Sequence, residues 1–253
     1  MKKTFFFLAL LVFSVGAYAQ QPDADHFKTG EGELTVQPVL HGTLMLQFNE
    51  KTIYVDPYGG AKAFEGLDKP DLILITDIHG DHLNETTLDE INAEGVPIIA
   101  PQAVKEKMSD KYKKNTSVVN NGEKNEEMGI AMEAIPMYNL PEAPDAKHVK
   151  GRGNGYILTM GDKRVYISGD TEDIPEMRAL KGIDIAFVCM NLPYTMDINQ
   201  AASAVLDFEP AVVYPYHYRG RPDMSDTEAF KALVDQGSKD IEVRLRNWYP
   251  SYE

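Results

Sequence analysis

The sequence predicts an α/β fold in which strands and helices alternate through two successive halves of the chain. Short apolar runs bounded by turn residues alternate with segments of helical periodicity, and the second half repeats the rhythm of the first. No linker or low-complexity segment divides the 253 residues, so the chain suits one domain after an N-terminal leader. Histidines and aspartates follow strand ends in both halves, which is where open α/β sheets place their sites.

The predicted elements begin after a polar lead-in at residues 20–32, for which we expect no regular structure. Residues 111–127 are also polar, with a turn predicted at Asn120-Asn121-Gly122. Strands are expected at residues 34–40, 43–49, 52–55, 71–76, 97–100, 130–136, 156–160, 164–168, 183–189, 211–214 and 241–245, and helices at residues 102–108, 174–180, 198–208 and 227–236, with a further helix starting at Asn84.

The first 19 residues have the pattern of a signal peptide. Lys2 and Lys3 precede an uncharged apolar run, and Ala17-Tyr18-Ala19 supplies the small-x-small pattern of a cleavage site. The uncharged stretch is short for a membrane span of ~20 residues, so we expect cleavage and no stable membrane anchor afterwards. The prediction is a signal peptide at residues 1–19 and a mature domain at residues 20–253 that is periplasmic or secreted.

The charge balance disfavours nucleic acid as a partner. The chain carries 25 Lys and Arg against 39 Asp and Glu, a formal net charge of −14, and loss of the two leader lysines (25 to 23) makes it −16. Such a surface repels nucleic-acid phosphates, whose binding depends on cationic contacts. A small-molecule substrate is therefore expected, while the oligomeric state stays open.

Cys189 is the only cysteine, and it lies in an apolar strand-like run. A single thiol cannot form an internal disulfide, whatever the redox compartment. We expect this side chain to be buried and to serve packing rather than nucleophilic catalysis.

Four ionisable side chains within six positions form the densest cluster: Asp77, His79, Asp81 and His82. They follow a buried-strand run and precede a predicted helix. Placing these carboxylates together costs free energy unless a cation neutralises them. Imidazole and carboxylate donors together suit zinc, iron or manganese, so the cluster predicts a metal centre; the alternative is an exposed acidic loop that happens to contain histidines.

This cluster resembles the H-x-H-x-D-H signature of the metallo-β-lactamase superfamily, with Asp77 in the first histidine position. Further segments resemble that family in the same order and spacing, and the branch that the chain most resembles contains the ascorbate-6-phosphate lactonase-like proteins. The resemblance implies a four-layer αββα sandwich with metal ions in a cleft at one edge. The additional segments are His41-Gly42-Thr43, Ile53-Tyr54-Val55-Asp56-Pro57, Ala134-Ile135-Pro136-Met137-Tyr138-Asn139, Ser168-Gly169-Asp170-Thr171 and Tyr214-Pro215-Tyr216-His217-Tyr218.

The resemblance implies two ligand sets for one or two divalent metal ions. Asp81, His82 and His217 would hold one ion, with Asp170 bridging. The other ion would take Asp77, His79 and the same Asp170. The third histidine of that set is replaced by Tyr138-Asn139, so either Asn139 or His148 would supply the missing donor. Oxygen donors favour manganese or iron as well as zinc, which leaves zinc or manganese as the leading metals and iron as a further alternative.

Catalytic roles are expected for Asp81 and His148. Hydrolysis would use a metal-bound hydroxide that Asp81 helps to orient, and His148 would protonate the leaving group if it is not a ligand. His148 lies in the basic segment Lys147-His148-Val149-Lys150, which would suit an anionic substrate; a solvent-exposed histidine beside lysines is the alternative.

Four further residues are candidates for supporting roles. His41 is expected either to face the cleft or to be a satisfied core histidine. Asp56 would hold the metal loop by hydrogen bonds rather than bind metal. Tyr194 and Arg219 would shape the substrate pocket or simply pack in loops.

Taken together, these features predict an exported metal-dependent hydrolase of an ester, lactone or phosphodiester. The alternative is a metal-binding protein of the same fold with little or no turnover, because Asp77 and Asn139 depart from the family pattern. Export argues against a cytosolic sugar phosphate, so the lactonase resemblance does not name the substrate.

Overall fold

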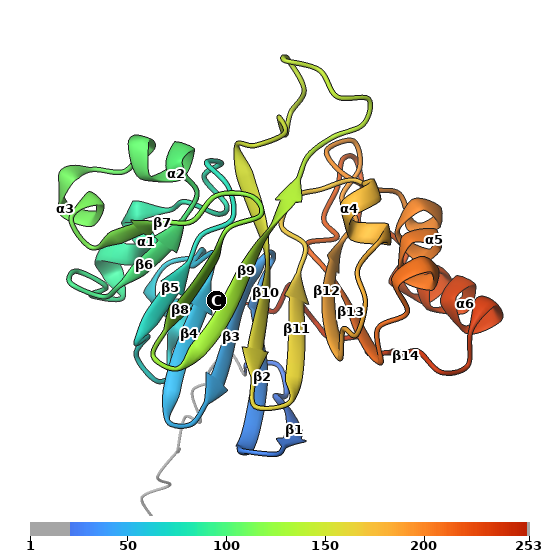
Figure 1. The fold of residues 1–253 in the computed structure, drawn as a ribbon, viewed down its shortest axis with the longest axis horizontal. Coiled ribbons are helices and arrows are strands. Elements are labelled where there is room, and N and C mark those ends of the chain that lie inside the picture. The colour runs from blue at the N-terminus through green and yellow to red at the C-terminus, as the bar shows by residue number, and fades with distance from the viewer. Residues whose placement is uncertain (1–20, 252–253) are drawn as a thin grey trace, which may run out of the picture.

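Two mixed β-sheets pack face to face with helices on both outer sides in the computed structural model, which describes residues 21–251 (Figure 1). This arrangement is the expected four-layer αββα sandwich. The predicted signal peptide, residues 1–19, lies outside the described residues.

Each sheet has seven strands and combines an antiparallel half with a parallel half. In spatial order the first sheet contains β1 (Asp25–Thr29), β2 (Gly32–Leu40), β3 (Thr43–Phe48), β4 (Lys51–Val55), β5 (Leu72–Leu74), β6 (Ile98–Ala100) and β7 (Thr116–Val118). The second contains β14 (Glu242–Val243), β13 (Val212–Tyr216), β12 (Ile185–Cys189), β11 (Lys163–Ile167), β10 (Gly153–Met160), β9 (Ile130–Met137) and β8 (Lys124–Glu127). Pairing is parallel from β4 to β7 and from β11 to β14, and antiparallel elsewhere.

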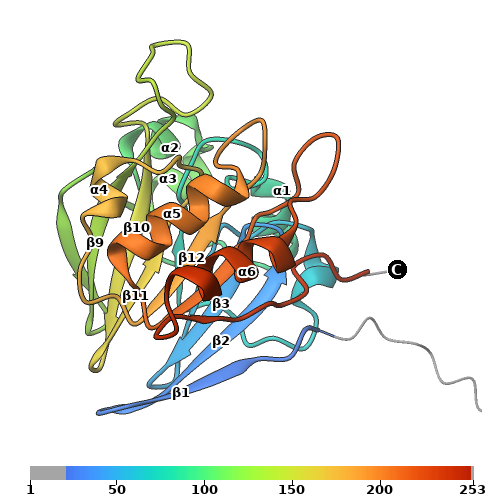
Figure 2. The same ribbon diagram turned by 90° about the vertical axis from the view of Figure 1, so that its right-hand side faces the viewer.

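Helices cover the outer face of each sheet. In Figure 1 the helices α1 (Glu85–Glu90), α2 (Gln102–Lys107) and α3 (Asp110–Lys113) lie beside the first sheet. The helices α4 (Pro175–Arg178), α5 (Ile198–Phe208) and α6 (Thr227–Gly237) cover the second sheet, and Figure 2 shows α5 and α6 across its face. A short 3-10 helix, η1 (Ala61–Phe64), follows β4.

Alternation along the strands divides the apolar side chains between two clusters. In β5, Leu72 and Leu74 join the cluster between the sheets, whereas Ile73 joins the cluster beneath α1, α2 and α3. Successive strand residues point to opposite faces, so a strand covered on both sides is apolar throughout. This explains why the central strands read as continuous apolar runs in the sequence.

Most predicted elements are confirmed, and the differences fall in polar segments. Within the lead-in expected to be irregular, β1 pairs antiparallel with β2; this expectation was wrong because the edge strand Asp25–Thr29 has a single apolar residue, Phe27, and so shows no apolar pattern. The polar region 111–127 contains most of α3 together with β7 and β8, which the sequence did not indicate. In the part of the chain that the structure describes, no helix has the length and apolar character needed to cross a membrane.

Candidate metal centre

The sequence-predicted donors come together because they follow the carboxyl ends of parallel strands in both sheets. Asp77 to His82 follow β5, and Asp170 follows β11 in the other sheet. His217 directly follows β13. Since the two sheets pack face to face, these loops meet at one edge of the sandwich.

Three strand-end residues adopt left-handed backbone conformations that place their side chains at this edge. The φ angles are 60° for His41, 45° for Asp56 and 48° for His217. Such a conformation costs roughly 1–2 kcal/mol for a residue with a Cβ atom, so the surrounding structure must impose it. Gly42 helps, because a Cβ atom there would lie 2.7 Å from Cδ2 of His217.

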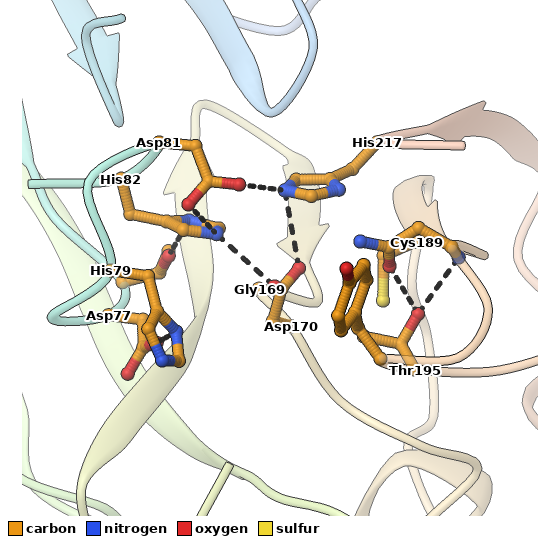
Figure 3. A network of polar contacts seen from close by, with 12 residues as sticks. Asp77, His79, Asp81, His82, Gly169, Asp170, Cys189, Thr195 and His217 are labelled. Atoms are coloured by element: carbon orange, nitrogen blue, oxygen red, sulfur yellow. Dashed lines mark hydrogen bonds and ion pairs between the residues drawn. The ribbon is translucent and has the colours of Figure 1, made fainter. Parts of the chain in front are cut away.

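Asp170 is the centre of the first group of donors, which Figure 3 shows converging from three loops. Its Oδ2 lies 3.3 Å from Nε2 of His82, and its Oδ1 lies 3.5 Å from Nε2 of His217. The Oδ2 of Asp81 is also 3.5 Å from Nε2 of His217. The structure therefore brings together the four residues expected to hold one ion.

His82 is oriented by a fully buried carboxylate. Its Nδ1 lies 2.8 Å from Oδ2 of Asp56, which also accepts a hydrogen bond from the Thr76 hydroxyl. The Oδ1 of Asp56 accepts the Thr76 backbone N–H at 2.8 Å. This arrangement leaves Nε2 of His82 pointing at Asp170, and it agrees with the supporting role expected for Asp56.

His82 and Asp170 shift each other's pKa. Burial alone would lower the pKa of His82, but the carboxylates of Asp170 and Asp56 raise it well above its usual range. Burial alone would raise the pKa of Asp170, but His217 and His82 hold it well below its usual range. Without a cation, protonated His82 would balance part of this negative charge; with one, its proton would leave.

Unpartnered polar atoms test whether the group suits a metal ion. Among the described residues, buried nitrogens or oxygens without a hydrogen-bond partner include Nε2 of His82, Nε2 of His217 and Oδ1 of Asp170. Buried polar groups are normally satisfied, so several unsatisfied donors aimed at one point are expected where a cation binds. The candidate ligand atoms of His82, Asp170 and His217 all lie within 4.8 Å of one another. These residues fit a divalent cation.

A second group consists of Asp77, His79 and His148, whose candidate ligand atoms also lie within 4.8 Å of one another. The Oδ2 of Asp77 is in close contact with Nδ1 of His79. Nε2 of His148 lies 3.2 Å from Oδ2 of Asp170, which places Asp170 between the two groups. Both ring nitrogens of His148 are buried without a hydrogen-bond partner.

Arg152 distinguishes this second group from the first. Its Nε lies 3.2 Å from Oδ1 of Asp77, and its Nη2 lies 3.2 Å from Oδ2. Burial alone would raise the pKa of Asp77, but the hydrogen bond to His79 and the nearby charges, Arg152 included, lower it to about 2. A carboxylate can still accept further contacts, although the guanidinium already compensates its charge.

The polar contacts of Asn139 favour His148 over Asn139 as the third donor of this group. Its Oδ1 accepts the backbone N–H of His148 at 2.7 Å, and its Nδ2 donates to the Tyr194 carbonyl at 2.8 Å. Asn139 therefore holds the loop that carries His148, while the His148 ring faces the donors. His148 is 1% exposed and does not line the cavity, which favours a ligand position over the exposed histidine or the proton donor considered above.

A cavity of about 280 Å³ opens beside the two groups. His79, Asp81 and Asp170 line it, together with Tyr194 and Arg219, the two residues expected to shape a substrate pocket. Its wall is completed by His41, Lys147, Asn191, Gly220 and Arg221.

His41 faces this cavity and also contacts Asp81. Its Nε2 lies 3.2 Å from Oδ2 of Asp81, and its Nδ1 lies 2.7 Å from the Tyr249 hydroxyl. Burial and the neighbouring His217 lower the pKa of His41 to about 4, so the ring is neutral at pH 7. Its Nε2–H then donates to Asp81, and Nδ1 accepts from Tyr249.

Cys189 is buried, as expected, and burial raises the pKa of its thiol to about 12. It is therefore a packing residue without nucleophilic character at neutral pH.

Sequence reasoning did not identify Arg152, Arg221 or Tyr249 as site residues. Arg152 lies 75 positions from Asp77, and Tyr249 lies 208 positions from His41, so no local pattern links either pair. Arg221 lies four residues after His217, and that proximity was the one available signal.

The chain is similar to known metal-dependent hydrolases. The β-lactamase superfamily domain matches residues 35–217. A protein of Pyrococcus horikoshii named a metal-dependent hydrolase is 33% identical over 194 residues, which cover 73% of this chain and 85% of that protein. The narrower resemblance to ascorbate-6-phosphate lactonase-like proteins stays a prediction.

Two solved structures extend the comparison. A candidate metal-dependent hydrolase from Parabacteroides distasonis has a TM-score of 0.77 at 41% identity and covers 89% of this chain and 98% of its own. A metallo-hydrolase from the archaeon Ignicoccus hospitalis has a TM-score of 0.70 at 24% identity, with coverage of 84% and 94%, and supports the fold alone.

Proposed function

Because the chain belongs to the β-lactamase superfamily and is a metal-dependent hydrolase, we propose that it hydrolyses an ester, a lactone or a phosphodiester of a small molecule. The observation that carries this proposal is the convergence of unpartnered donor atoms from His82, Asp170 and His217 beside a cavity. A bound divalent ion would supply an activated water and stabilise the developing oxyanion there.

The residues of the chain would hold the ion and orient the attacking water. His82, His217 and Asp81 would hold one ion, with Asp170 shared between the two groups. Asp81 faces the cavity and is fixed by His41, so it is placed to accept a hydrogen bond from the attacking water.

A second ion would be held by His79, His148 and Asp77, again with Asp170. Because Arg152 already compensates Asp77, we propose that this site binds its ion more weakly than the first. Zinc and manganese suit these nitrogen and carboxylate donors, and iron is a further alternative.

The proposed function is tested on purified mature protein loaded separately with zinc, manganese and iron. Metal content is measured alongside turnover of a panel of esters, lactones and phosphodiesters. Metal-dependent hydrolysis that chelation abolishes is the expected result. Bound metal without turnover of any class would favour the alternative, a metal-binding protein of this fold.

We also propose that the protein is exported to the periplasm or secreted after loss of residues 1–19. The support is the charged start, the apolar run and Ala17-Tyr18-Ala19. Mass spectrometry of the protein from intact cells should find an N-terminus at Gln20 or its cyclised form. An intact chain starting at Met1 and retained in the membrane would contradict this.

A further inference from the structure

Three cations line the cavity without an anionic partner. Lys147, Arg219 and Arg221 all belong to its wall. Among residues 21–251, no carboxylate oxygen lies within 4.0 Å of their charged nitrogens, although Lys150 and Arg152 nearby are paired with carboxylates. In a chain of net charge −14, three unpaired cations on one small cavity indicate a site for negative charge.

Lys150, in contrast to these three residues, is paired with carboxylates outside the cavity. It was considered with Lys147 as a contact for an anionic substrate, but its Nζ lies 3.0 Å from Glu142 and 3.2 Å from Glu176. It also donates to the Tyr138 hydroxyl, and it does not line the cavity. Of the two lysines in this segment, only Lys147 lines the cavity, with Nζ 5.7 Å from the ring centre of Tyr194.

The Arg219–Arg221 segment is held in place by contacts that leave its charges free. The guanidinium of Arg219 stacks on the Tyr249 ring at 4.1 Å, and its backbone N–H donates to the Tyr249 hydroxyl at 2.7 Å. The backbone N–H of Arg221 donates to the Leu192 carbonyl at 2.7 Å. Between them, a Cβ atom on Gly220 would lie 2.3 Å from that carbonyl, so the two chain segments pack closely.

With a divalent ion bound, the charge at the cavity would also be positive. Asp81 and Asp170 are the carboxylates on the cavity wall, and a divalent ion would compensate both. The three cations then remain as uncompensated charge close to the reacting bond. A cavity of about 280 Å³ can hold a small ligand, whose anionic group would then lie near the bound ion.

Resting on the proposed hydrolysis, we propose that Arg219 and Arg221, together with Lys147, bind an anionic group of the substrate that takes no part in the reaction. The planar guanidinium presents several N–H donors and suits the oxygens of a carboxylate or a phosphate. The substrate class is therefore a small ester, lactone or phosphodiester that carries a carboxylate or phosphate away from the bond that breaks.

The kinetic test compares two esters with the same leaving group, the 4-nitrophenyl monoester of adipic acid and the neutral 4-nitrophenyl hexanoate, on zinc-loaded protein. We expect kcat/KM for the anionic ester to exceed that for the neutral ester by about tenfold or more at low salt, and the ratio to fall as salt rises. Arg219→Gln and Arg221→Gln should each move the ratio towards one, and Arg219→Lys should restore part of it.

Lys28→Gln is the matched control, since it removes one exposed positive charge from β1, away from the cavity. It should leave the ratio unchanged. A wild-type ratio of one or below, or a ratio that Arg219→Gln, Arg221→Gln and Lys28→Gln change equally, would overturn the proposal.

A binding test separates this inference from the proposed function. Calorimetry on metal-loaded protein uses succinate and inorganic phosphate as probes, which also distinguishes the two kinds of anion. Weaker binding to Arg219→Gln and Arg221→Gln at unchanged metal content would support the anion site even if no ester is hydrolysed. Equal binding to wild type and both variants would reject it even if turnover is observed.

Discussion

Replacing Asp56 with asparagine should weaken metal binding without removing any proposed ligand. The substitution keeps the size of the side chain and the Oδ1 that accepts the Thr76 backbone N–H. It replaces Oδ2, which lies 2.8 Å from Nδ1 of His82, with an amide that donates instead of accepting. His82 would then carry its proton on Nε2, the nitrogen 3.3 Å from Asp170, and that nitrogen would lose its lone pair for a metal.

The expected size of the effect follows from the buried position of this contact. Asp56 is 0% exposed, so no water can substitute for the lost acceptor. Loss of a carboxylate that orients a ligating histidine typically weakens metal affinity about 10- to 100-fold, which corresponds to about 1.4–2.7 kcal/mol.

Competition between the protein and a zinc chelator of known affinity measures this change, and circular dichroism confirms that the variant is folded. Asp162→Asn is a suitable control, because Asp162 is an exposed carboxylate that also accepts a backbone N–H, from Gly30. Zinc affinity equal to wild type in Asp56→Asn would refute the reasoning, as would an equal loss in Asp162→Asn.

Further predictions concern both groups of donors. His82→Ala and His217→Ala should each lose most bound metal by elemental analysis yet keep a native circular dichroism spectrum, since the large core does not depend on metal. Zinc uptake by metal-free protein at pH 7 should release protons, because the raised pKa of His82 keeps its ring protonated until a cation displaces the proton. Zinc affinity should therefore fall as pH is lowered. Calorimetry in two buffers of different ionisation enthalpy counts the released protons. Arg152→Met should destabilise metal-free protein by about 3 kcal/mol, since it leaves Asp77 buried without its cation, and added metal should restore more stability than in wild type. Urea unfolding with and without zinc measures the last effect, and equal destabilisation in both conditions would show that Asp77 is not near a bound ion.

Local patterns in the sequence were sufficient to predict those elements that depend on residues close together in the chain. The helix expected at residues 198–208 is α5 with the same bounds, because Asp197 and Gln200 form a capping box and the apolar positions recur with helical spacing. The strands before Asp77 and Asp170 were identified from continuous apolar runs. The cluster at residues 77–82 was predictable for the same reason, since its donors are near neighbours in sequence.

Only the tertiary structure decided which residues complete the site. The β1 strand is polar except at Phe27 and pairs only with β2, so its own sequence does not indicate a strand. Lys147 and Lys150 are equivalent in sequence, yet Lys150 is neutralised by Glu176 from another element while Lys147 remains free.

In the second group of donors, the contacts of His148 and Arg152 likewise could not be predicted from local sequence. His148 reaches Asp170 because Asn139 holds its loop, and Arg152 reaches Asp77 from the start of a strand in the other sheet. Contacts between residues far apart in the chain depend on how the two sheets pack. That packing sums many weak apolar contacts, and no single local pattern encodes it.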